Sequence, residues 1–367
     1  MTLPPTWIDP RAPDSAESST DLATEQAGRD LMRGLAAIRR HQLPSGEIPT
    51  YQYDREDHYE YRRSPFISTF VHDALGYLDP SCPWFDPHGL EAIPASCRRA
   101  FVQALAATRR RIRAFIAWQE EPSGMWRFFG RSSGMDPDSD DTSCAATVLL
   151  ECASSRSSDR CQRRFDALAR FRSPAGPYFT WIGPDGRAYN GTDEGQQPFG
   201  FDRIVNANVL RYLALVGGDV RNVSAYLLNE LERHDFQTGS PYYPNPLCFF
   251  YMVARAWRQA ALPGRDRIAS LLVPHVLGLQ RADGAFGGPL ATALAAATLC
   301  DLEYRGPALG AAMAFLLDLR ARKLASEHEA FFVHGFGSPA WTVALSMMVL
   351  ARAHRAAGIA DHGGNLA

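Results

Sequence analysis

Two kinds of helical segment alternate along this chain of 367 residues, and this alternation constrains its fold more than any other feature. Segments of the first kind carry charges on one face and apolar residues on the other, which is typical of surface helices. Segments of the second kind are apolar or small all round, which is typical of buried helices. The amphipathic segments span 21–42, 97–119, 158–172, 219–235, 264–280 and 306–325, and the apolar segments span 64–78, 140–153, 201–215, 242–257, 288–302 and 338–353.

Six surface helices that alternate with six buried helices predict an all-α double ring, the (α/α)6 barrel. Three buried segments open with a capping residue and then proline, which is the signature of a helix start; these are Ser64-Pro65, Asn245-Pro246 and Ser338-Pro339. We therefore expect all six inner helices to begin at one end of the barrel. Their predicted starts lie near Ser64, Asp140, Phe201, Tyr242, Gly288 and Ser338.

The turns from outer to inner helices also repeat. Each tends to carry glutamine, then a polar residue, then glycine, at Gln42 to Gly46, Gln119 to Gly124, Gln237 to Gly239 and Gln280 to Gly284. A turn that recurs in a helical array indicates a repeat architecture. We expect one barrel domain over 21–355, a flexible arm over 1–20 and a flexible tail over 356–367.

One segment, residues 173–200, breaks the alternation. Within it, "YFTWI" and "RAY" flank Pro184-Asp185-Gly186 and predict a short hairpin around 178–190. A long segment of this kind is often a lid or a pocket wall. The alternative is a surface loop without a function.

Composition excludes several classes of protein. The net charge is −2, so no basic surface for nucleic acid is expected. No run of eighteen apolar residues predicts a membrane span, and the N-terminus lacks the pattern of a signal peptide.

The seven cysteines include no CxxC pair, and most, such as Cys144, Cys152, Cys248 and Cys300, stand among apolar residues. We expect reduced, buried thiols in a cytoplasmic protein.

An acidic cluster, Asp136, Asp138, Asp140 and Asp141, precedes the second apolar segment. A calcium-binding EF-hand loop would need glycine and glutamate where Asp141 and Thr147 stand. A DDxxD magnesium motif would need aspartate at the position of Cys144. A solvated group of helix caps is an alternative, although one aspartate is enough to cap a helix.

The remaining interpretation is a carboxylic acid that keeps its proton. Asp138, Asp140 and Asp141 cannot all ionise cheaply if they lie close together. A helix N-terminus favours the anion by only ~0.3–1 kcal/mol, less than one pKa unit. Burial can raise the pKa of a carboxyl group by up to ~3–5 units, so the acid should stay protonated in a dry site. Such an acid suits a very weak base, for example an alkene.

The surroundings predict a pocket for a cation, because aromatic rings stabilise positive charge by ~0.5–2 kcal/mol each. Ordinary core packing is the alternative for each ring. The candidate aromatic residues of the pocket are Trp126, Phe129, Tyr178, Trp181, Tyr242, Phe286 and Trp341.

Polar candidates accompany these rings. Asp202, Asn206 and Asn208 interrupt the third apolar segment, where they either face the pocket or form a satisfied core network. His334 could hydrogen-bond the aspartates. Arg62 and Arg63 could bind a diphosphate or lie at the surface.

The residues "DSDDT" from Asp138 to Thr142 resemble the DxDDT motif of class II terpene cyclases, the squalene–hopene cyclase-like family. The stretch from Gln280 to Gly287 is similar to the QxxDGxW/FG repeat of that family, with Phe286 in the aromatic place. The resemblance implies the (α/α)6 fold, with Asp140 as the general acid and Asp138 and Asp141 as neighbours that tune it.

The chain departs from that family in one respect that bears on the site. Family members usually have two barrels with the active site between them, and this chain has room for one. The substrate would then lie in the single barrel mouth, under residues 173–200, or at the interface of a homo-oligomer. Related single-barrel prenyltransferase subunits hold zinc, but the mouth at 287–296 has no matching cysteine. No metal or cofactor is expected, except magnesium if the substrate carries a diphosphate.

The expected function is a class II terpene cyclase, which protonates an isoprenoid alkene or epoxide and guides the resulting cation to a cyclic product. The same site could instead hydrate, dehydrate or isomerise a terpenoid. An (α/α)6 carbohydrate enzyme would need a second, separated carboxylate, for which Asp202 is the candidate. A non-catalytic isoprenoid-binding protein is a further alternative.

Overall fold

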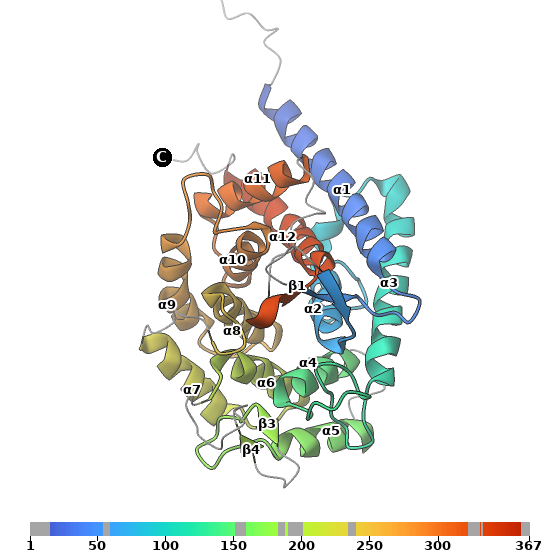
Figure 1. Cartoon of the computed structure of the whole chain (residues 1–367). Coiled ribbons are helices and arrows are strands. Elements are labelled where there is room, and N and C mark those ends of the chain that lie inside the picture. The colour runs from blue at the N-terminus through green and yellow to red at the C-terminus, as the bar shows by residue number, and fades with distance from the viewer. Residues whose placement is uncertain are drawn as a thin grey trace, which may run out of the picture.

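Twelve α-helices make up most of the described part of the chain in a computed structural model (Figure 1). The structure describes residues 15–53, 59–150, 159–182, 188–189, 201–233, 240–321, 331 and 333–360. The outer helices are α1 (Ser15–His41), α3 (Ala95–Trp118), α5 (Asp159–Ala169), α7 (Arg221–Glu232), α9 (Arg265–Gly278) and α11 (Pro307–Ala321). The inner helices are α2 (Pro65–Gly76), α4 (Ser139–Leu150), α6 (Arg203–Val216), α8 (Pro246–Gln259), α10 (Pro289–Asp301) and α12 (Pro339–Ala360).

The inner helices form a closed ring. Each packs against the next, and α12 packs back against α2. Every residue of α2 and α10 is buried, whereas α3, α7 and α9 bury only one face. The predicted double ring of six outer and six inner helices is therefore confirmed, and its cause is the hydrophobic pattern, since only an apolar helix can be surrounded on all sides.

Capping residues fix where most inner helices start. Ser64 accepts from the backbone N–H of Phe66, and Asn245 accepts from that of Leu247. Because Pro246 follows this cap, α8 begins there rather than near Tyr242, whereas the other predicted starts lie within two residues of the observed ones. The prediction of a cap at Ser338 is wrong, since its buried hydroxyl makes no hydrogen bond and only proline marks that start.

Two of the predicted glutamine–glycine turns make the same hydrogen bonds. The side-chain nitrogen of Gln42 donates to the carbonyl of Gly46 at 3.0 Å and to a carbonyl of α3. Gln280 does the same with Gly284, also at 3.0 Å, and with a carbonyl of α11. Both glycines have a left-handed φ, which glycine adopts without strain. The turn at Gln119 differs, because this side chain accepts from a backbone N–H twelve residues on.

A second bond ties each turn to the inner helix that follows it. The residue two positions after the turn glycine donates its backbone N–H to a hydroxyl on the fourth residue of that helix. We call this contact the turn lock, and it joins Ile48 with Ser68 at 2.9 Å, Trp126 with Thr142 at 3.2 Å and Phe286 with Thr292 at 3.0 Å.

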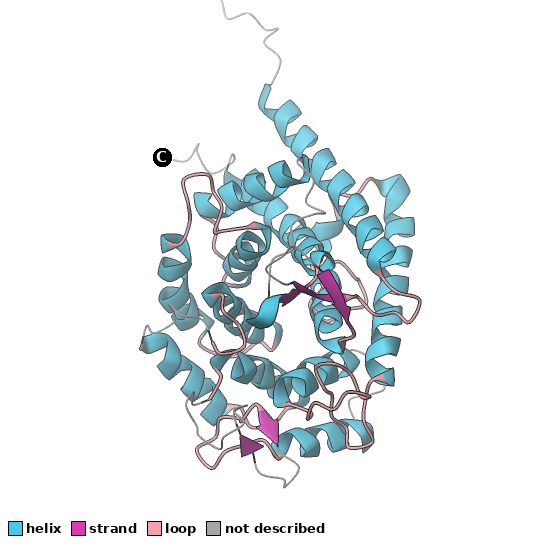
Figure 2. Ribbon diagram, in the orientation of Figure 1, coloured by secondary structure: helices cyan, strands magenta, loops and turns pink. Residues whose placement is uncertain are grey.

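Two small sheets accompany the helices (Figure 2). The predicted hairpin is present as β3 (Trp181–Ile182) and β4 (Ala188–Tyr189), which pair antiparallel. The second sheet was not predicted. It has the order β2-β1-β5, in which β1 (Thr50–Tyr53) pairs with both β2 (Tyr59–Arg62) and β5 (Phe336–Gly337). Two short 3₁₀ turns, η1 (Pro87–Leu90) and η4 (Val333–Gly335), complete the described elements.

The ends of the helical region differ from the predicted boundaries. Helix α1 begins at Ser15, inside the predicted arm, and α12 runs to Ala360, inside the predicted tail. Residues 1–14 and 361–367, the turn at Gln237, and Cys152 lie outside the described residues. The six described cysteines are all free, and five of them are buried. Within the described ranges, no helix is both long enough and apolar enough to cross a bilayer.

Candidate active site

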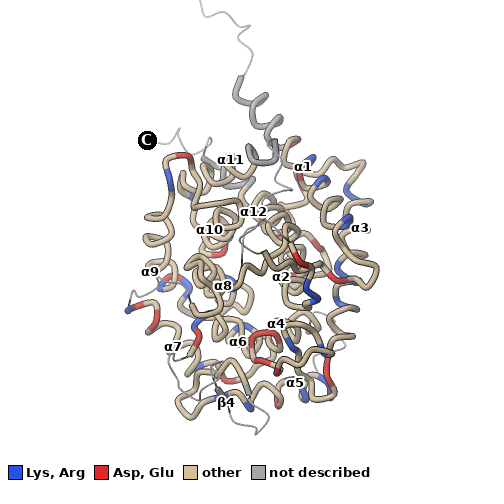
Figure 3. Tube along the Cα trace, viewed as in Figure 1, with Lys and Arg blue, Asp and Glu red and all other residues tan. Residues whose placement is uncertain are grey.

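The acidic cluster lies at the start of α4, at the inner edge of the ring of helices (Figure 3). Asp138 caps this helix, because its Oδ1 accepts from the backbone N–H of Asp141 at 2.6 Å. The backbone of Ser139 donates to the carbonyl of Thr180 at 2.9 Å, and Asp138 forms a β-bridge with Trp181. The segment before β3 thus holds the start of α4 in place and covers it from solvent.

Asp140 receives two hydrogen bonds from neighbouring inner-helix regions. The side-chain nitrogen of Asn208, in α6, donates to Oδ1 at 2.8 Å, and the hydroxyl of Tyr243, before α8, donates to Oδ2. The Asp140 side chain remains at the cavity wall with 7% of its surface exposed, more than Asp138 or Asp141. Two neutral donors therefore hold Asp140 in one orientation, and no cation among the described residues forms an ion pair with it.

The three acids resist ionisation. Burial raises the pKa of Asp140 to about 7, and the charge of Asp138 adds to the rise, whereas hydrogen bonds from Tyr243 and Asn208 oppose it. Burial also raises the pKa of Asp138 to about 6. The pKa of Asp141 lies well above its ordinary value, because it is buried beside Asp138 and hydrogen-bonds it. A proton is thus available on this cluster near neutral pH.

A buried chain of polar contacts continues behind Asn208. Arg255 donates to the side-chain oxygen of Asn208 at 2.5 Å and to Asp73 at 3.1 Å. Arg211 pairs with the other oxygen of Asp73. These four side chains are at most 3% exposed, and two arginines against one aspartate leave a net charge of +1 beneath the acid. That charge favours the Asp140 carboxylate once its proton has left.

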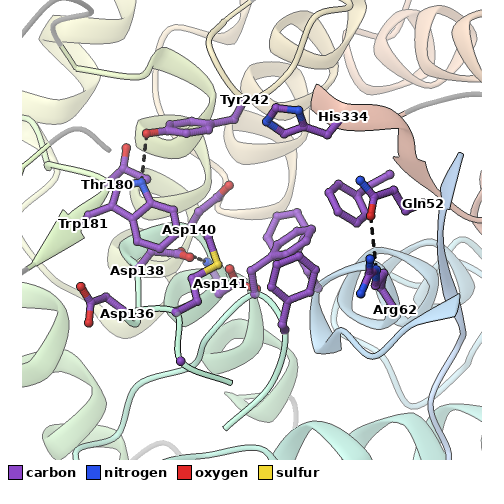
Figure 4. Close-up of a pocket in the computed structure, with 16 residues that line it drawn as sticks. Gln52, Arg62, Asp136, Asp138, Asp140, Asp141, Thr180, Trp181, Tyr242 and His334 are labelled. Carbon is purple, nitrogen blue, oxygen red and sulfur yellow. Dashed lines mark hydrogen bonds between the residues drawn. The ribbon is translucent and has the colours of Figure 1, made fainter. Parts of the chain in front are cut away.

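A cavity of about 730 Å³ lies beside the aspartates (Figure 4). Seven of the predicted site residues line it, namely Asp138, Asp140, Asp141, Phe129, Trp181, Tyr242 and His334. Its further lining residues are Gln52, Arg62, Phe66, Phe128, Gly134, Met135, Asp136, Thr180 and Phe336. Rings from the mouths of four inner helices and from the 173–200 segment therefore meet at one cavity.

Four predicted aromatic residues belong to the core instead of the cavity lining, namely Trp126, Tyr178, Phe286 and Trp341. Trp126 and Phe286 take part in turn locks, and the indole N–H of Trp126 also donates to a carbonyl of α3 at 2.8 Å. Trp341 is fully buried and packs against the rings of Phe70 and Phe331. Their positions at helix mouths suggested that they line the pocket. The turn lock instead places Trp126 and Phe286 behind the wall of the cavity.

Two of the polar candidates of this region, Asp202 and Asn206, make structural contacts, whereas Asn208 reaches the acid. Asp202 caps α6, because its Oδ1 accepts from the backbone N–H groups of Ile204 and Val205. Asn206 bonds both backbone groups of Tyr178, at 2.7 Å and 3.0 Å, and Tyr178 itself is buried outside the cavity lining. These contacts match the core-network alternative, and they anchor the segment that leads to Thr180 and Trp181.

His334 and the two arginines occupy different places. His334 lines the cavity opposite the acids, and the described structure records no hydrogen bond between it and an aspartate. Arg62 lines the cavity as well. Arg63 is 52% exposed and lies 3.9 Å from a carboxylate oxygen of Glu47.

Sequence reasoning named Asn208 among the polar candidates, but it did not single out Tyr243 as a partner of the acid and it missed one cavity wall. Asn208 and Tyr243 are an amide and a ring in apolar surroundings, and no spacing pairs either with Asp140, since Asn208 lies in α6 and Tyr243 in the segment before α8. The wall of β1 and β2 did leave a signal, because Tyr51, Tyr53, Tyr59 and Tyr61 alternate with polar residues as in strands.

The fold has solved counterparts. The type II terpene cyclase MstE from Scytonema matches with a TM-score of 0.62 and 14% identity, over 91% of this chain and 99% of that one. An MstE variant in complex with its substrate, geranylgeranyl dihydroxybenzoate, matches over the same shares with a TM-score of 0.61 and 14% identity. A sugar epimerase from a ruminal bacterium matches with a TM-score of 0.57 and 10% identity, over 91% and 99%. At these identities the likeness shows the fold alone, which is an α/α barrel that the terpene cyclase and the epimerase share.

Comparisons of the sequence with family models and curated proteins identify no relative. No protein-family model matches the chain, and no curated protein matches it. Among the described residues, no three side chains of histidine, cysteine, aspartate or glutamate are placed to hold a metal ion.

Proposed function

We propose that this protein is a class II, squalene–hopene cyclase-like terpene cyclase, in which Asp140 is the general acid that protonates an isoprenoid alkene or epoxide. The observation that carries the proposal is the setting of Asp140. Its carboxyl group is buried, it has a pKa of about 7, and it lies at the wall of an aromatic cavity. A carboxylic acid that keeps its proton near neutral pH can donate it to a weak base.

The first step breaks the O–H bond of Asp140 and forms a C–H bond at the alkene, which leaves a carbocation in the cavity and a carboxylate on Asp140. Asn208 and Tyr243 already donate to both carboxylate oxygens, so the new charge needs no reorganisation. The start of α4 and the +1 charge around Arg255 favour the same anion. These groups stabilise the product of proton transfer, while burial keeps the reactant acid protonated.

The aromatic cavity suits the second part of the reaction. Phe66, Phe128, Phe129 and Phe336 form a continuous set of rings with centroids 4.9–5.8 Å apart. Ring faces stabilise a passing cation and offer it no nucleophile. The cation can then form carbon–carbon bonds before it loses a proton, so the product of cyclisation has the mass of the substrate.

A carbohydrate enzyme is the alternative function for the same fold. It would need a second carboxylate across the barrel, and Asp202 was its candidate. Asp202 caps α6 and does not line the cavity, so it is not placed to supply that second carboxylate. The aromatic lining also suits a hydrocarbon chain better than a sugar.

Incubation of the purified protein with prenyl substrates, followed by mass spectrometry, tests the proposal. The panel should contain geranyl, farnesyl and geranylgeranyl chains, each as the free compound and as the diphosphate, with and without magnesium. A new product of unchanged mass supports cyclisation or isomerisation, and nuclear magnetic resonance separates these two by the presence of a ring. A gain or loss of water would indicate a hydratase or dehydratase, and binding without turnover of any compound would indicate a binding protein.

A further inference from the structure

The cavity has a second polar end, on the wall formed by β1, β2 and β5. Gln52 lies on β1, Arg62 ends β2, and His334 precedes β5. In Figure 4, Gln52 and Arg62 lie across the cavity from Asp138 and Asp140, and His334 lies on the same side as Gln52. We call these three side chains the sheet-wall group.

Backbone pairing fixes the members of this group relative to one another. Gln52 pairs in register with Glu60 on β2 and with Phe336 on β5. The side-chain oxygen of Gln52 accepts from Nε of Arg62 at 3.2 Å, and Glu60 accepts from one terminal nitrogen of Arg62 at 2.8 Å. The guanidinium group is therefore oriented by two acceptors, and no described residue accepts a hydrogen bond from its other terminal nitrogen.

His334 is held in a conformation that few non-glycine residues adopt. Its φ is 59° and its ψ is 22°, which lie in the left-handed region. The next residue, Gly335, passes so close to β1 that a Cβ there would lie 2.4 Å from the carbonyl oxygen of Tyr53. Backbone strain of this kind persists only where the surrounding structure imposes it, and it is concentrated at functional sites. The strained turn presents the imidazole at the cavity instead of letting it turn away.

Between the two polar ends the cavity is apolar. The rings of Phe66, Phe128, Phe129 and Phe336 contact one another in an unbroken series. A molecule that fits this arrangement has a hydrocarbon chain in the middle, an alkene at the acid end and a polar head at the sheet wall. This reading rests on the proposed function for the alkene end, but the head-group end stands on separate residues.

The charge at the wall limits the head group. Arg62 is the single lysine or arginine among the described lining residues, and Glu60 already offsets part of its charge. A diphosphate carries several negative charges and would also face the acidic cluster across the cavity. A carboxylate carries one charge, and its two oxygens match the planar donors of a guanidinium group. Gln52 and His334 add hydrogen-bonding groups beside it.

We propose that the sheet-wall group binds a single carboxylate at the polar end of the isoprenoid substrate, with Arg62 as the specificity-determining residue. The carboxylate lies away from the reacting alkene, so this contact sets which substrate binds and in which direction it lies. Arg62 takes no part in proton transfer.

The test compares substrates that share one prenyl chain and differ only in the head: a carboxylic acid, its methyl ester and the corresponding diphosphate. Wild type is expected to show a KM for the acid about tenfold or more below that for the ester, which corresponds to ~1.4 kcal/mol. Arg62→Leu should remove that difference by raising KM for the acid alone, with kcat nearly unchanged. Arg62→Lys should keep part of the preference, because it retains the charge and loses the planar fork.

Arg63→Leu is the matched control, since Arg63 is the neighbouring arginine and does not line the cavity. It should leave the preference for the acid unchanged. A preference for the diphosphate in wild type, or equal losses for acid and ester in Arg62→Leu, would overturn the proposal.

Binding measured by calorimetry on Asp140→Asn separates this inference from the proposed function. If the variant binds the acid better than the ester and wild type makes no product, the head-group site stands and the cyclase proposal fails. If wild type forms product while neither its turnover nor the binding distinguishes acid from ester, the cyclase proposal stands and the head-group site is wrong. If none of the three compounds binds or reacts, both fail.

Discussion

The side-chain amide of Asn208 donates to Asp140 at 2.8 Å and accepts from Arg255 at 2.5 Å. A flipped amide would set its oxygen against the carboxyl group and its nitrogen against the guanidinium donors. Arg255 therefore fixes which end of Asn208 faces the acid, although Arg255 itself does not contact Asp140. The orientation of the proposed acid is in this way set from beneath the cavity.

Replacement of Asn208 by leucine should slow proton transfer. The change keeps the approximate shape but removes one donor to the Asp140 carboxylate, and hydrogen bonds to charged groups contribute ~1.5–3 kcal/mol. We expect kcat to fall about tenfold to a hundredfold, with little change in KM, and the loss of activity at high pH to begin at a higher pH. Steady-state kinetics across a pH series measures all three.

Asn206→Leu is the control for this variant, because Asn206 lies two residues away in α6 and holds the backbone of Tyr178. It should lower the melting temperature without a shift of the pH profile. The same shift in both variants would show that the Asn208 effect comes from general loosening of α6.

Substitution of the aspartates by asparagine should give graded losses of activity. Asp140→Asn removes the transferable proton, so activity should fall by about 10²–10⁴-fold, the usual contribution of a general acid. Asp138→Asn should cost less, because the amide oxygen can still cap α4, and Asp136→Asn should cost least. Turnover and melting temperature are measured side by side for the three variants. Wild-type turnover in Asp140→Asn, or a collapse of its fold, would remove the acid role.

Activity should decline as the pH rises through about 7, since Asp140 must be protonated and its pKa is raised to about 7. Stability should follow the same direction. The folded protein holds this proton between the ordinary aspartate pKa near 3.8 and about 7, while the unfolded chain releases it, so stability falls as pH rises across that window. Thermal unfolding from about pH 5 to 7 should show a shallower decline in Asp140→Asn than in wild type. Identical slopes would place the retained proton elsewhere.

Tyr243→Phe should separate acid strength from packing. The ring contact with Phe331, at a centroid distance of 5.5 Å, is kept, and only the hydroxyl that donates to Asp140 is lost. Because that bond lowers the pKa of Asp140, its removal should raise the pKa further. Maximal turnover should fall while the decline at high pH moves upward. An unchanged pH profile would argue that the hydroxyl has no influence on the acid.

The threonine of the DSDDT stretch should matter for stability. Thr142→Val leaves the buried backbone N–H of Trp126 without its acceptor, which costs ~1–3 kcal/mol. Thr147→Val is the matched control in the same helix, because the hydroxyl of Thr147 bonds only a carbonyl of its own helix. Chemical denaturation should show a large loss for the first variant and a small one for the second. Equal losses would mean that the turn lock adds nothing.

Sequence alone predicted the double ring because the hydrophobic pattern decides which helices can be surrounded. It also placed the acids at the mouth of an inner helix. It could not separate the aromatic residues of the cavity from those of the core. Phe129 lines the cavity and Trp126 lies in the core, yet they are three residues apart, and only Trp126 takes part in a turn lock. The partners of Asp140 come from α6 and from the segment before α8, and only the ring closure brings them together.

The pairing of β1 with β5 has a consequence for biosynthesis of the chain. Tyr51 and Gln52 find their partners at Gly337 and Phe336, so the β1–β2 hairpin that carries Arg62 lacks its third strand until almost the whole barrel has left the ribosome. A nascent chain with its acidic cluster already translated would still lack one side of the cavity. Emergence of the last inner helix thus sets the earliest moment at which the cavity can hold a substrate.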